Sequence, residues 1–315
     1  IYSLNPKWAF SKEATAVPAE VSSRWNFVNL PHSWNAIDGQ DGANDYYRGT
    51  AWYAHELDKE DLPEADRYYI EICGANSSAD LYVDGEKLMH HDGGYSTWRA
   101  DITEKLQQKT LIALAVDNAP NDRVYPQMAD FTFYGGLYRN VNLICVNESH
   151  FDLDYYGGPG LKVTPVIEGA DAKVEIEAYL TNMKENQGLR FSILDAEGAL
   201  VTEGVTDEKK AVLLLNNVHL WNGKKDPYLY TAEIQLTEDG SVLEKTVLIP
   251  LGDAANPLTW DDLEDKLSAC SEGLLSEENQ KKLMENIHNF DRFNKIDTTN
   301  TTATTFAENT DWTTS

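Results

Sequence analysis

The chain has 315 residues, 42% of them hydrophobic, and carries 52 acidic against 26 basic side chains, a formal net charge of −26 at pH 7. This length is typical of about two domains with packed cores. Such a negative chain repels phosphate backbones, which argues against a nucleic-acid partner. No apolar run approaches the roughly 18 residues of a membrane span, so the sequence predicts none.

The composition leaves the cellular compartment open. Three cysteines are too few and too scattered for a disulfide framework: Cys73, Cys145 and Cys270. The chain starts at Ile1 with no basic-then-apolar leader, so we expect a signal peptide either to have been removed or never to have existed. A bacterial protein that is secreted, periplasmic or cytoplasmic is compatible with this pattern.

Residues 8–146 predict short β-strands separated by turns. Residues 81–83 lead into Asp84-Gly85, which is typical of a strand that enters a tight turn. The alternation in residues 110–116 predicts a strand with three apolar side chains on one face: Ile112, Leu114 and Val116. Many short strands with glycine-rich breaks favour an antiparallel sandwich or a jelly roll, and we assign it residues 1–148.

A second β region follows over residues 149–252. Residues 174–181 and 230–237 alternate apolar and polar side chains, which predicts strands with one buried and one wet face. About 100 residues with this alternation and Gly/Asp turns suggest an immunoglobulin-like sandwich.

The pattern changes after Gly252. Residues 253–296 predict two helices. The first begins at a capping box over residues 259–262, and the second begins at Ser276 with three apolar positions behind it: Leu283, Ile287 and Phe290. Residues 297–315 are rich in threonine and poor in apolar residues, which predicts a flexible tail. The predicted fold class is therefore mainly β, a jelly roll and then an immunoglobulin-like sandwich, with a short helical carboxyl-terminal segment.

Five short motifs in the order of the chain carry a resemblance to a known family. They are LPHSWN at 30–35, YYRG at 46–49, LYVDG at 81–85, DFTFYGGLYRNV at 130–141, and LWN with DPYLY at 220–230. Together they resemble glycoside hydrolase family 2, which holds β-galactosidases, β-glucuronidases and β-mannosidases. The first four are similar to the amino-terminal sugar-binding jelly roll of that family, and the last to the end of its immunoglobulin-like domain.

Family members of this kind continue into a (β/α)₈ barrel that carries two catalytic glutamates. Only 63 residues follow Gly252, whereas such a barrel takes about 250. Retaining glycosidases hold two carboxyl groups about 5 Å apart on a rigid frame. We therefore expect no glycoside hydrolysis by this chain alone, and the sequence predicts no catalytic residue, cofactor or metal site within it.

The resemblance implies that several residues contact a sugar. It puts the carboxylate of Asp130 near sugar hydroxyls, and an ionised carboxylate accepts the two hydrogen bonds of a vicinal diol. The family directs the loops around Asn35, Asp45 and Tyr47 toward the active site, where an amide and a ring face suit a sugar. Trp34 is a further candidate, although core packing is the favoured interpretation for its ring. For Asp130, the alternative to a sugar contact is a structural role as a turn residue that caps its loop.

Two arginines and a histidine pair favour structural interpretations. Arg48 and Arg139 lie between strand-forming aromatics, and we expect buried ion pairs for them. His90-His91-Asp92 invites a metal interpretation, but adjacent residues of a strand point to opposite faces and no further ligands have zinc spacing. Solvated loop histidines are expected instead.

These observations lead to two main hypotheses. In the first, the chain is the non-catalytic portion of a family 2 glycoside hydrolase and completes the sugar site of a barrel on another chain or in a longer product. In the second, it is a stand-alone carbohydrate-binding or adhesion module. The expected partners are a β-glycoside, a catalytic barrel domain or subunit, or a second copy of the chain, since an uncovered docking face favours self-association.

Overall fold

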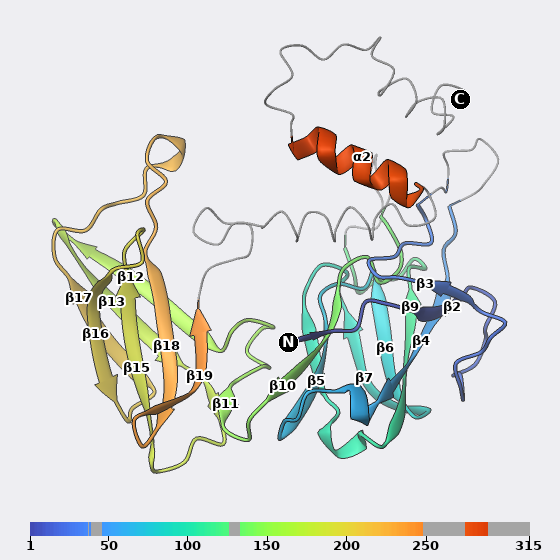
Figure 1. The fold of residues 1–315 in the computed structure, drawn as a ribbon, viewed down its shortest axis with the longest axis horizontal. Helices are drawn as coiled ribbons and strands as arrows, with labels where there is room; N and C mark the ends of the chain where they lie inside the picture. Colours follow the sequence, from blue (N-terminus) through green and yellow to red (C-terminus); the bar gives the residue numbers. More distant parts are fainter. Residues whose placement is uncertain (37, 39–45, 126–132, 248–274, 289–315) are drawn as a thin grey trace, which may run out of the picture. The chain divides into compact units, whose positions relative to one another are not determined.

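The computed structural model describes residues 1–36, 38, 46–125, 133–247 and 275–288 (Figure 1). The described residues form two compact units. The larger comprises residues 1–33 and 48–247, and the smaller comprises residues 34–36, 38, 46–47 and 275–288. None of the described helices is long and apolar enough to cross a membrane.

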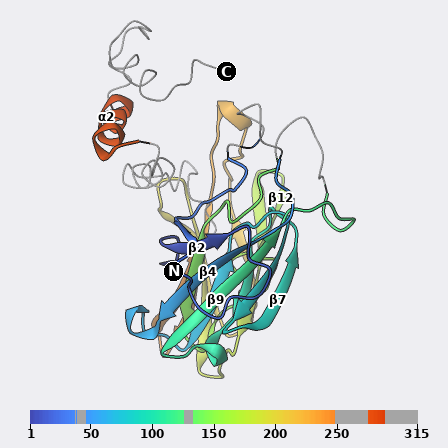
Figure 2. The same ribbon diagram turned by 90° about the vertical axis from the view of Figure 1, so that its right-hand side faces the viewer.

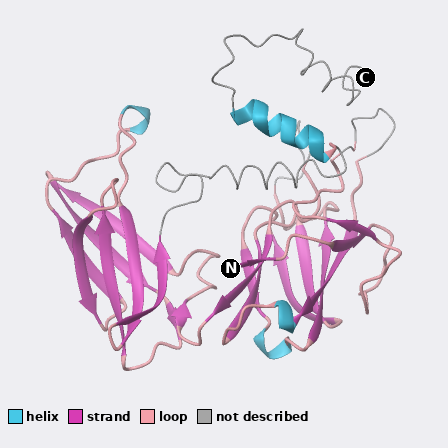
Figure 3. Ribbon diagram, in the orientation of Figure 1, coloured by secondary structure: helices cyan, strands magenta, loops and turns pink. Residues whose placement is uncertain are grey.

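The described part of the chain is mainly β, as the sequence predicts (Figure 3). Its first β region, strands β1 to β10, contains two antiparallel sheets. The larger has the order β3-β2-β4-β9-β6-β7, and its strands are β2 (Trp8–Ser11), β3 (Asn26–Val28), β4 (Thr50–Asp58), β6 (Ser78–Val83), β7 (Glu86–Asp92) and β9 (Lys109–Asp117). The smaller has the order β1-β10-β5-β8, and its strands are β1 (Tyr2–Ser3), β5 (Arg67–Ile72), β8 (Trp98–Asp101) and β10 (Val141–Val146). Two short 3₁₀ helices, η1 (Lys59–Asp61) and η2 (Thr103–Lys105), connect strands of this region.

Strands β4 and β9 run side by side in the middle of the six-stranded sheet (Figure 2) and are buried on both faces. Ile112, Leu114 and Val116 are fully buried on the face that the sequence predicts. Much of the opposite face of β9 is also covered, because Val17 and Trp25 pack against the cluster that contains Trp52, Ala113 and Ala115. A central strand that is covered on both sides has a nearly continuous apolar sequence, which the alternation alone does not reveal.

The turn at Asp84-Gly85 joins β6 to β7 as predicted. Both residues have positive φ, 46° for Asp84 and 82° for Gly85. Two consecutive positive φ values are those of a type I′ hairpin turn, which Asp-Gly adopts readily.

The second β region, strands β11 to β19, contains three further antiparallel sheets. Their orders are β12-β13-β17, β16-β15-β18-β19 and β11-β14. The strands are β11 (His150–Phe151), β12 (Leu161–Glu168), β13 (Asp171–Ala178), β14 (Leu180–Thr181), β15 (Gln187–Leu194), β16 (Leu200–Thr206), β17 (Lys210–Leu215), β18 (Thr231–Glu238) and β19 (Ser241–Val247), with the 3₁₀ helix η3 at Gly223–Lys225. Their buried apolar side chains form one core around Phe191, Leu189, Ile176, Ile234 and Leu236.

The two alternating segments of this region are strands, as predicted. Val174, Ile176 and Ala178 are buried on β13, and Ala232, Ile234 and Leu236 are buried on β18. The first predicted strand is broken at Tyr179, since Leu180 belongs to the separate strand β14. The immunoglobulin-like and jelly-roll assignments and the domain boundaries stay predictions.

One helix, α2 (Glu277–His288), lies among the described residues. It begins as the sequence predicts, because the Ser276 Oγ accepts a hydrogen bond from the Asn279 N–H at 3.3 Å. The other predicted helix, near 259–267, and the threonine-rich segment 297–315 lie outside the described residues.

Candidate functional site

Two of the family-like motifs meet at one edge of the first β region. The His32 N–H donates to the Leu137 carbonyl at 2.8 Å, and the Ser33 Oγ donates to the Gly135 carbonyl at 3.0 Å. His32 Nδ1 and Tyr53 Oη are 2.8 Å apart. Burial, with a smaller contribution from a nearby lysine, lowers the pKa of His32 to about 4, so its imidazole is neutral at pH 7. This histidine is a structural hydrogen-bonding group.

A third segment joins this edge through Asn76. Its backbone exchanges two hydrogen bonds with Gly136, at 3.1 and 3.3 Å, and its side-chain amide donates to the Tyr134 carbonyl at 2.9 Å. A Cβ on Gly94 would collide with Asn76 Oδ1, so glycine is required where the 93–94 turn passes over Asn76. The 133–137 segment is thus held by backbone and side-chain bonds from two directions.

Two exposed tyrosines lie at this edge, and neither is among the predicted site residues. Tyr95 is 50% exposed and Tyr134 is 45% exposed. Tyr95 stands edge-to-face with Tyr138 at a centroid distance of 6.4 Å, and the Tyr138 Oη donates to the Gly94 carbonyl. Each exposed tyrosine adjoins a Gly-Gly pair, 93–94 or 135–136, and this sequence signal could have identified them. We call this surface, Tyr95, Tyr134 and Tyr138, the tyrosine edge.

Arg139 differs from the buried ion pair that the sequence suggested. It is exposed, and its Nη1 donates to the Tyr95 carbonyl at 3.0 Å. Its guanidinium carbon lies 5.3 Å from the centroid of the Tyr138 ring. A backbone carbonyl and a ring face therefore hold the cation next to the tyrosine edge. Arg48 is half-buried just before β4, and its ion pair stays a prediction.

The 34–47 loop belongs to the smaller unit and has a polar clamp of its own. Asn35 is fully buried, and its Nδ2 donates to Asp38 Oδ2 at 2.6 Å and to the Tyr47 carbonyl at 3.1 Å. The Tyr47 N–H donates to the same Asp38 oxygen at 3.0 Å. The rings of Trp34 and Tyr47 stand edge-to-face at 6.2 Å, with Trp34 only 5% exposed. Asp38, which is not among the predicted site residues, thus joins the two ends of the loop.

Asp130 and Asp45 lie outside the described residues, so their contacts with a sugar stay predictions. The two histidines that invited a metal interpretation have separate partners. His90 is bonded to Asp80 and Asp92, whereas His91 Nε2 is 2.9 Å from Ser96 Oγ. The described residues contain no group of three His, Cys, Asp or Glu side chains that could hold a metal ion.

The comparisons with known proteins identify a class. Residues 159–248 match the family model for "Glycosyl hydrolases family 2". A β-glucuronidase from Bacteroides fragilis is 30% identical over 257 residues, which cover 74% of this chain and 37% of that protein. A β-galactosidase from Thermoanaerobacter pseudethanolicus is 26% identical over 234 residues, 70% of this chain and 31% of its own length.

Solved structures agree with these sequence matches. The chain superimposes on an FMN-binding β-glucuronidase from Faecalibacterium prausnitzii with a TM-score of 0.69 and 32% sequence identity, over 85% of this chain and 46% of that one. A β-glucuronidase from Bacteroides uniformis gives a TM-score of 0.67 at 28% identity, over 78% of this chain and 31% of its own.

The chain belongs to glycoside hydrolase family 2, and it spans only about a third of the length of the curated relatives it matches.

Proposed function

We propose that this chain is the non-catalytic sugar-binding and immunoglobulin-like portion of a family 2 glycoside hydrolase acting on β-glycosides. In this proposal it supports a catalytic barrel and completes the sugar site of that barrel. The proposal rests on one observation, which is how small a share of each relative this chain covers. The matches extend over 70–74% of this chain but only 31–37% of a β-glucuronidase and a β-galactosidase.

The geometry of two loop clusters supports this role. The clamp of Asn35, Asp38 and Tyr47 and the bonded 133–137 segment are both held by hydrogen bonds within their own units. A loop that is fixed before a ligand arrives loses little conformational entropy on binding. In the proposal, the ring of Tyr47 faces the sugar, and the buried side chains of Asn35 and Trp34 position Tyr47. The carboxylates of Asp130 and Asp45 accept hydrogen bonds from sugar hydroxyls.

A chimeric enzyme tests the proposal. The matching portion of the Bacteroides fragilis β-glucuronidase is replaced by this chain, and turnover of a chromogenic β-glucuronide is measured. We expect turnover by the chimera and none by this chain alone. In the chimera, Asp130→Asn should lower kcat/KM by about tenfold or more, because hydrogen bonds to a charged group are lost. Turnover by the purified chain alone, or a folded chimera that is inactive, contradicts the proposal.

The alternative is a stand-alone carbohydrate-binding or adhesion module. The exposed tyrosine edge favours it, because exposed aromatic rings stack on the C–H faces of sugars. Calorimetric titration of the chain with methyl β-galactoside and methyl β-glucuronide tests it. Binding that is lost in Tyr95→Ala and Tyr134→Ala supports the module, and a lack of binding at millimolar sugar removes it.

A further inference from the structure

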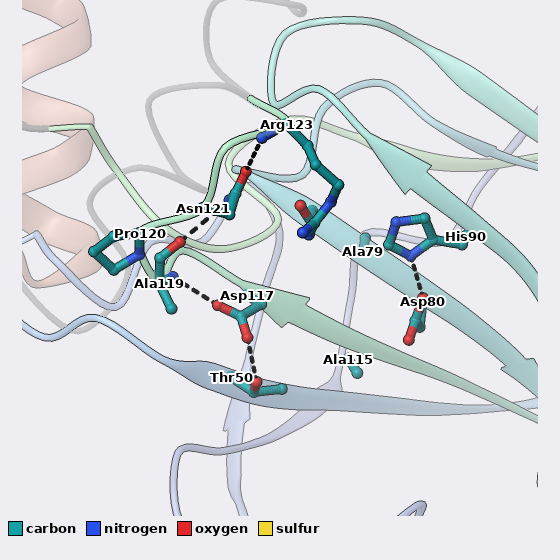
Figure 4. Close-up of a pocket in the computed structure, with 11 residues that line it drawn as sticks. Thr50, Ala79, Asp80, His90, Ala115, Asp117, Ala119, Pro120, Asn121 and Arg123 are labelled. Carbon is teal, nitrogen blue, oxygen red and sulfur yellow. Dashed lines mark hydrogen bonds and ion pairs between the residues drawn. The ribbon is translucent and has the colours of Figure 1, made fainter. Parts of the chain in front are cut away.

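A polar pocket of about 320 Å³ lies on the six-stranded sheet of the first β region (Figure 4). It shares no residue with the tyrosine edge or with the 34–47 loop. Strands β4, β6, β7 and β9 and the loop after β9 contribute its lining, which includes Thr50, Asp80, His90, Ala115, Asp117 and Arg123. Its volume is at the lower end of the range for small-molecule sites, so it suits one small ligand unit.

The pairing register explains why the sheet is hollow here. Ala115 on β9 lies directly opposite Asp80 on β6 and Trp52 on β4. Directly opposite residues of neighbouring strands share a face, so the methyl group of Ala115 stands between two longer side chains. In the next row, Asp117 accepts a hydrogen bond from the Thr50 Oγ1 at 2.6 Å. The hollow has an apolar floor and polar walls.

The charges around the hollow are paired. Asp80 Oδ1 lies 2.8 Å from Lys87 Nζ and 2.5 Å from His90 Nδ1. Asp92 Oδ2 lies 3.2 Å from His90 Nε2 and 2.9 Å from Arg123 Nε. Figure 4 shows the Arg123 side chain reaching from the loop toward β6 and β7. The pocket therefore favours neither a strong anion nor a strong cation.

The pocket also keeps hydrogen-bonding capacity on both sides. Within the described part of the chain, Asp80 bonds through Oδ1 and Arg123 bonds through Nε, which leaves Asp80 Oδ2 and the two terminal guanidinium nitrogens to other partners. Each oxygen of Asp117 accepts one bond, from Thr50 or from the Ala119 N–H, and a carboxylate oxygen can accept two. Acceptors thus face donors across the hollow.

We propose that this pocket binds a neutral sugar residue, separately from the site in the proposed function. A sugar hydroxyl both donates and accepts, so adjacent hydroxyls match Asp80 or Asp117 on one side and Arg123 on the other. The C–H face of the ring lies against Ala115 and Pro120. A sugar with its own carboxylate faces Asp80 and Asp117 as like charges and binds more weakly.

Amide chemical shifts of the full chain test this proposal. The isotopically labelled chain is titrated with methyl β-D-galactopyranoside, with methyl β-D-glucopyranoside and with the charged methyl β-D-glucuronide. We expect saturable shifts for amides of β6, β9 and residues 119–123 with the neutral glycosides, and weaker binding of the glucuronide.

Three variants sharpen the test. Asp80→Asn keeps the shape of the pocket but loses the charge-assisted acceptor, and Ala115→Val fills the hollow without changing a polar group. Each should raise the Kd of the neutral glycoside by about tenfold or more. Glu175→Gln, an exposed change on β13, is the matched control and should leave the Kd unchanged. Circular dichroism verifies that each variant is folded. If a variant does not fold, the amide shifts of the wild-type chain alone decide whether the pocket binds the glycoside.

The outcomes separate this proposal from the proposed function. Shifts confined to the 34–47 loop or the tyrosine edge overturn the pocket and leave the proposed function intact. The pocket proposal is wrong if neither neutral glycoside causes a saturable shift. It is also wrong if the glucuronide binds more tightly than both neutral glycosides. An inactive chimera contradicts the proposed function but leaves the pocket unaffected.

Discussion

The interior of the first β region contains more polar side chains than the interior of the second β region, which is mainly apolar. The buried polar side chains of the first region include Glu71, Asn76, Ser77, Ser78, Thr110 and Asn118. In the second region, strands β11 to β19, the comparably buried polar side chains among the described residues are His150, Gln187 and Ser192. The core around Phe191 holds the second region together.

This difference indicates how the two regions divide their roles. A buried polar group is costly unless it is hydrogen-bonded, and once it is bonded it fixes one local geometry. Asn76 fixes the 133–137 segment in this way, next to the tyrosine edge. Apolar packing stabilises a fold without directing loops so specifically. We therefore expect function to lie mainly in the first region and mechanical support in the second.

Truncation of the apolar core should have the largest effect. Phe191 is fully buried on β15, and Phe191→Ala leaves a cavity that should lower the free energy of unfolding of the second region by about 3–5 kcal/mol. Hydrogen exchange read by peptide should show lost protection in β15 and β18. Equal loss in β4 and β9 would mean that the two regions unfold as one unit.

Removal of a buried charge tests the first region together with its connection to the second. Arg99 Nε lies 2.7 Å from Glu71 Oε2, with side chains 10% and 9% exposed, and Arg99 Nη1 donates to the Leu153 and Gly158 carbonyls. Arg99→Ala leaves the buried Glu71 carboxylate without its paired cation, which should cost about 3–5 kcal/mol in urea unfolding.

Two controls accompany the arginine variant. The double variant Arg99→Met with Glu71→Gln should recover part of the loss, because no charge then stays buried. Lys109→Ala breaks a solvent-exposed pair with Glu56 and should leave the unfolding midpoint unchanged. A larger effect from Lys109→Ala than from Arg99→Ala would contradict the assignment of stability to the buried pair.

Acid should stabilise the second region through Glu244. Its Oε2 accepts a hydrogen bond from the Phe151 N–H at 3.1 Å, and burial raises the pKa of this carboxyl to about 7. The folded state therefore prefers the protonated form. Stability on the order of 2–3 kcal/mol should be lost as pH rises from about 4.5 to about 7 and should then level off. The unfolding free energy of Glu244→Gln should lack this pH-dependent loss. A pH profile equal to that of the wild-type chain would contradict the role of Glu244.

The smallest expected effect concerns His90 at the pocket. Hydrogen bonds to Asp80 and then Asp92 raise its pKa above the ordinary value. The protonated form is thus favoured in the folded state, and the associated stability, below about 1 kcal/mol for this exposed group, is lost as pH rises through the folded pKa. An NMR titration of the imidazole should show the raised pKa and a lower one in Asp80→Asn. An equal pKa of His90 in both proteins would mean that Asp80 does not cause the shift.

The sequence by itself determined the strands and the cap of α2. The alternation in β13 and β18 has a period of two, which only a strand with one buried face satisfies, and Ser276 supplies the side-chain acceptor that a helix start requires. The family likewise follows from motifs that are local in the chain. These features depend on neighbours within a few residues, so they can be inferred without the fold.

Only the tertiary structure decided what surrounds each functional candidate. Asn35 is a plausible sugar contact in the sequence, but in the structure its amide is occupied by Asp38 and Tyr47. The hollow at Ala115 exists because the register sets it between Asp80 and Trp52, residues far from it in the chain. Register and loop contacts depend on long-range pairing, and local sequence patterns do not encode which distant residue lies opposite.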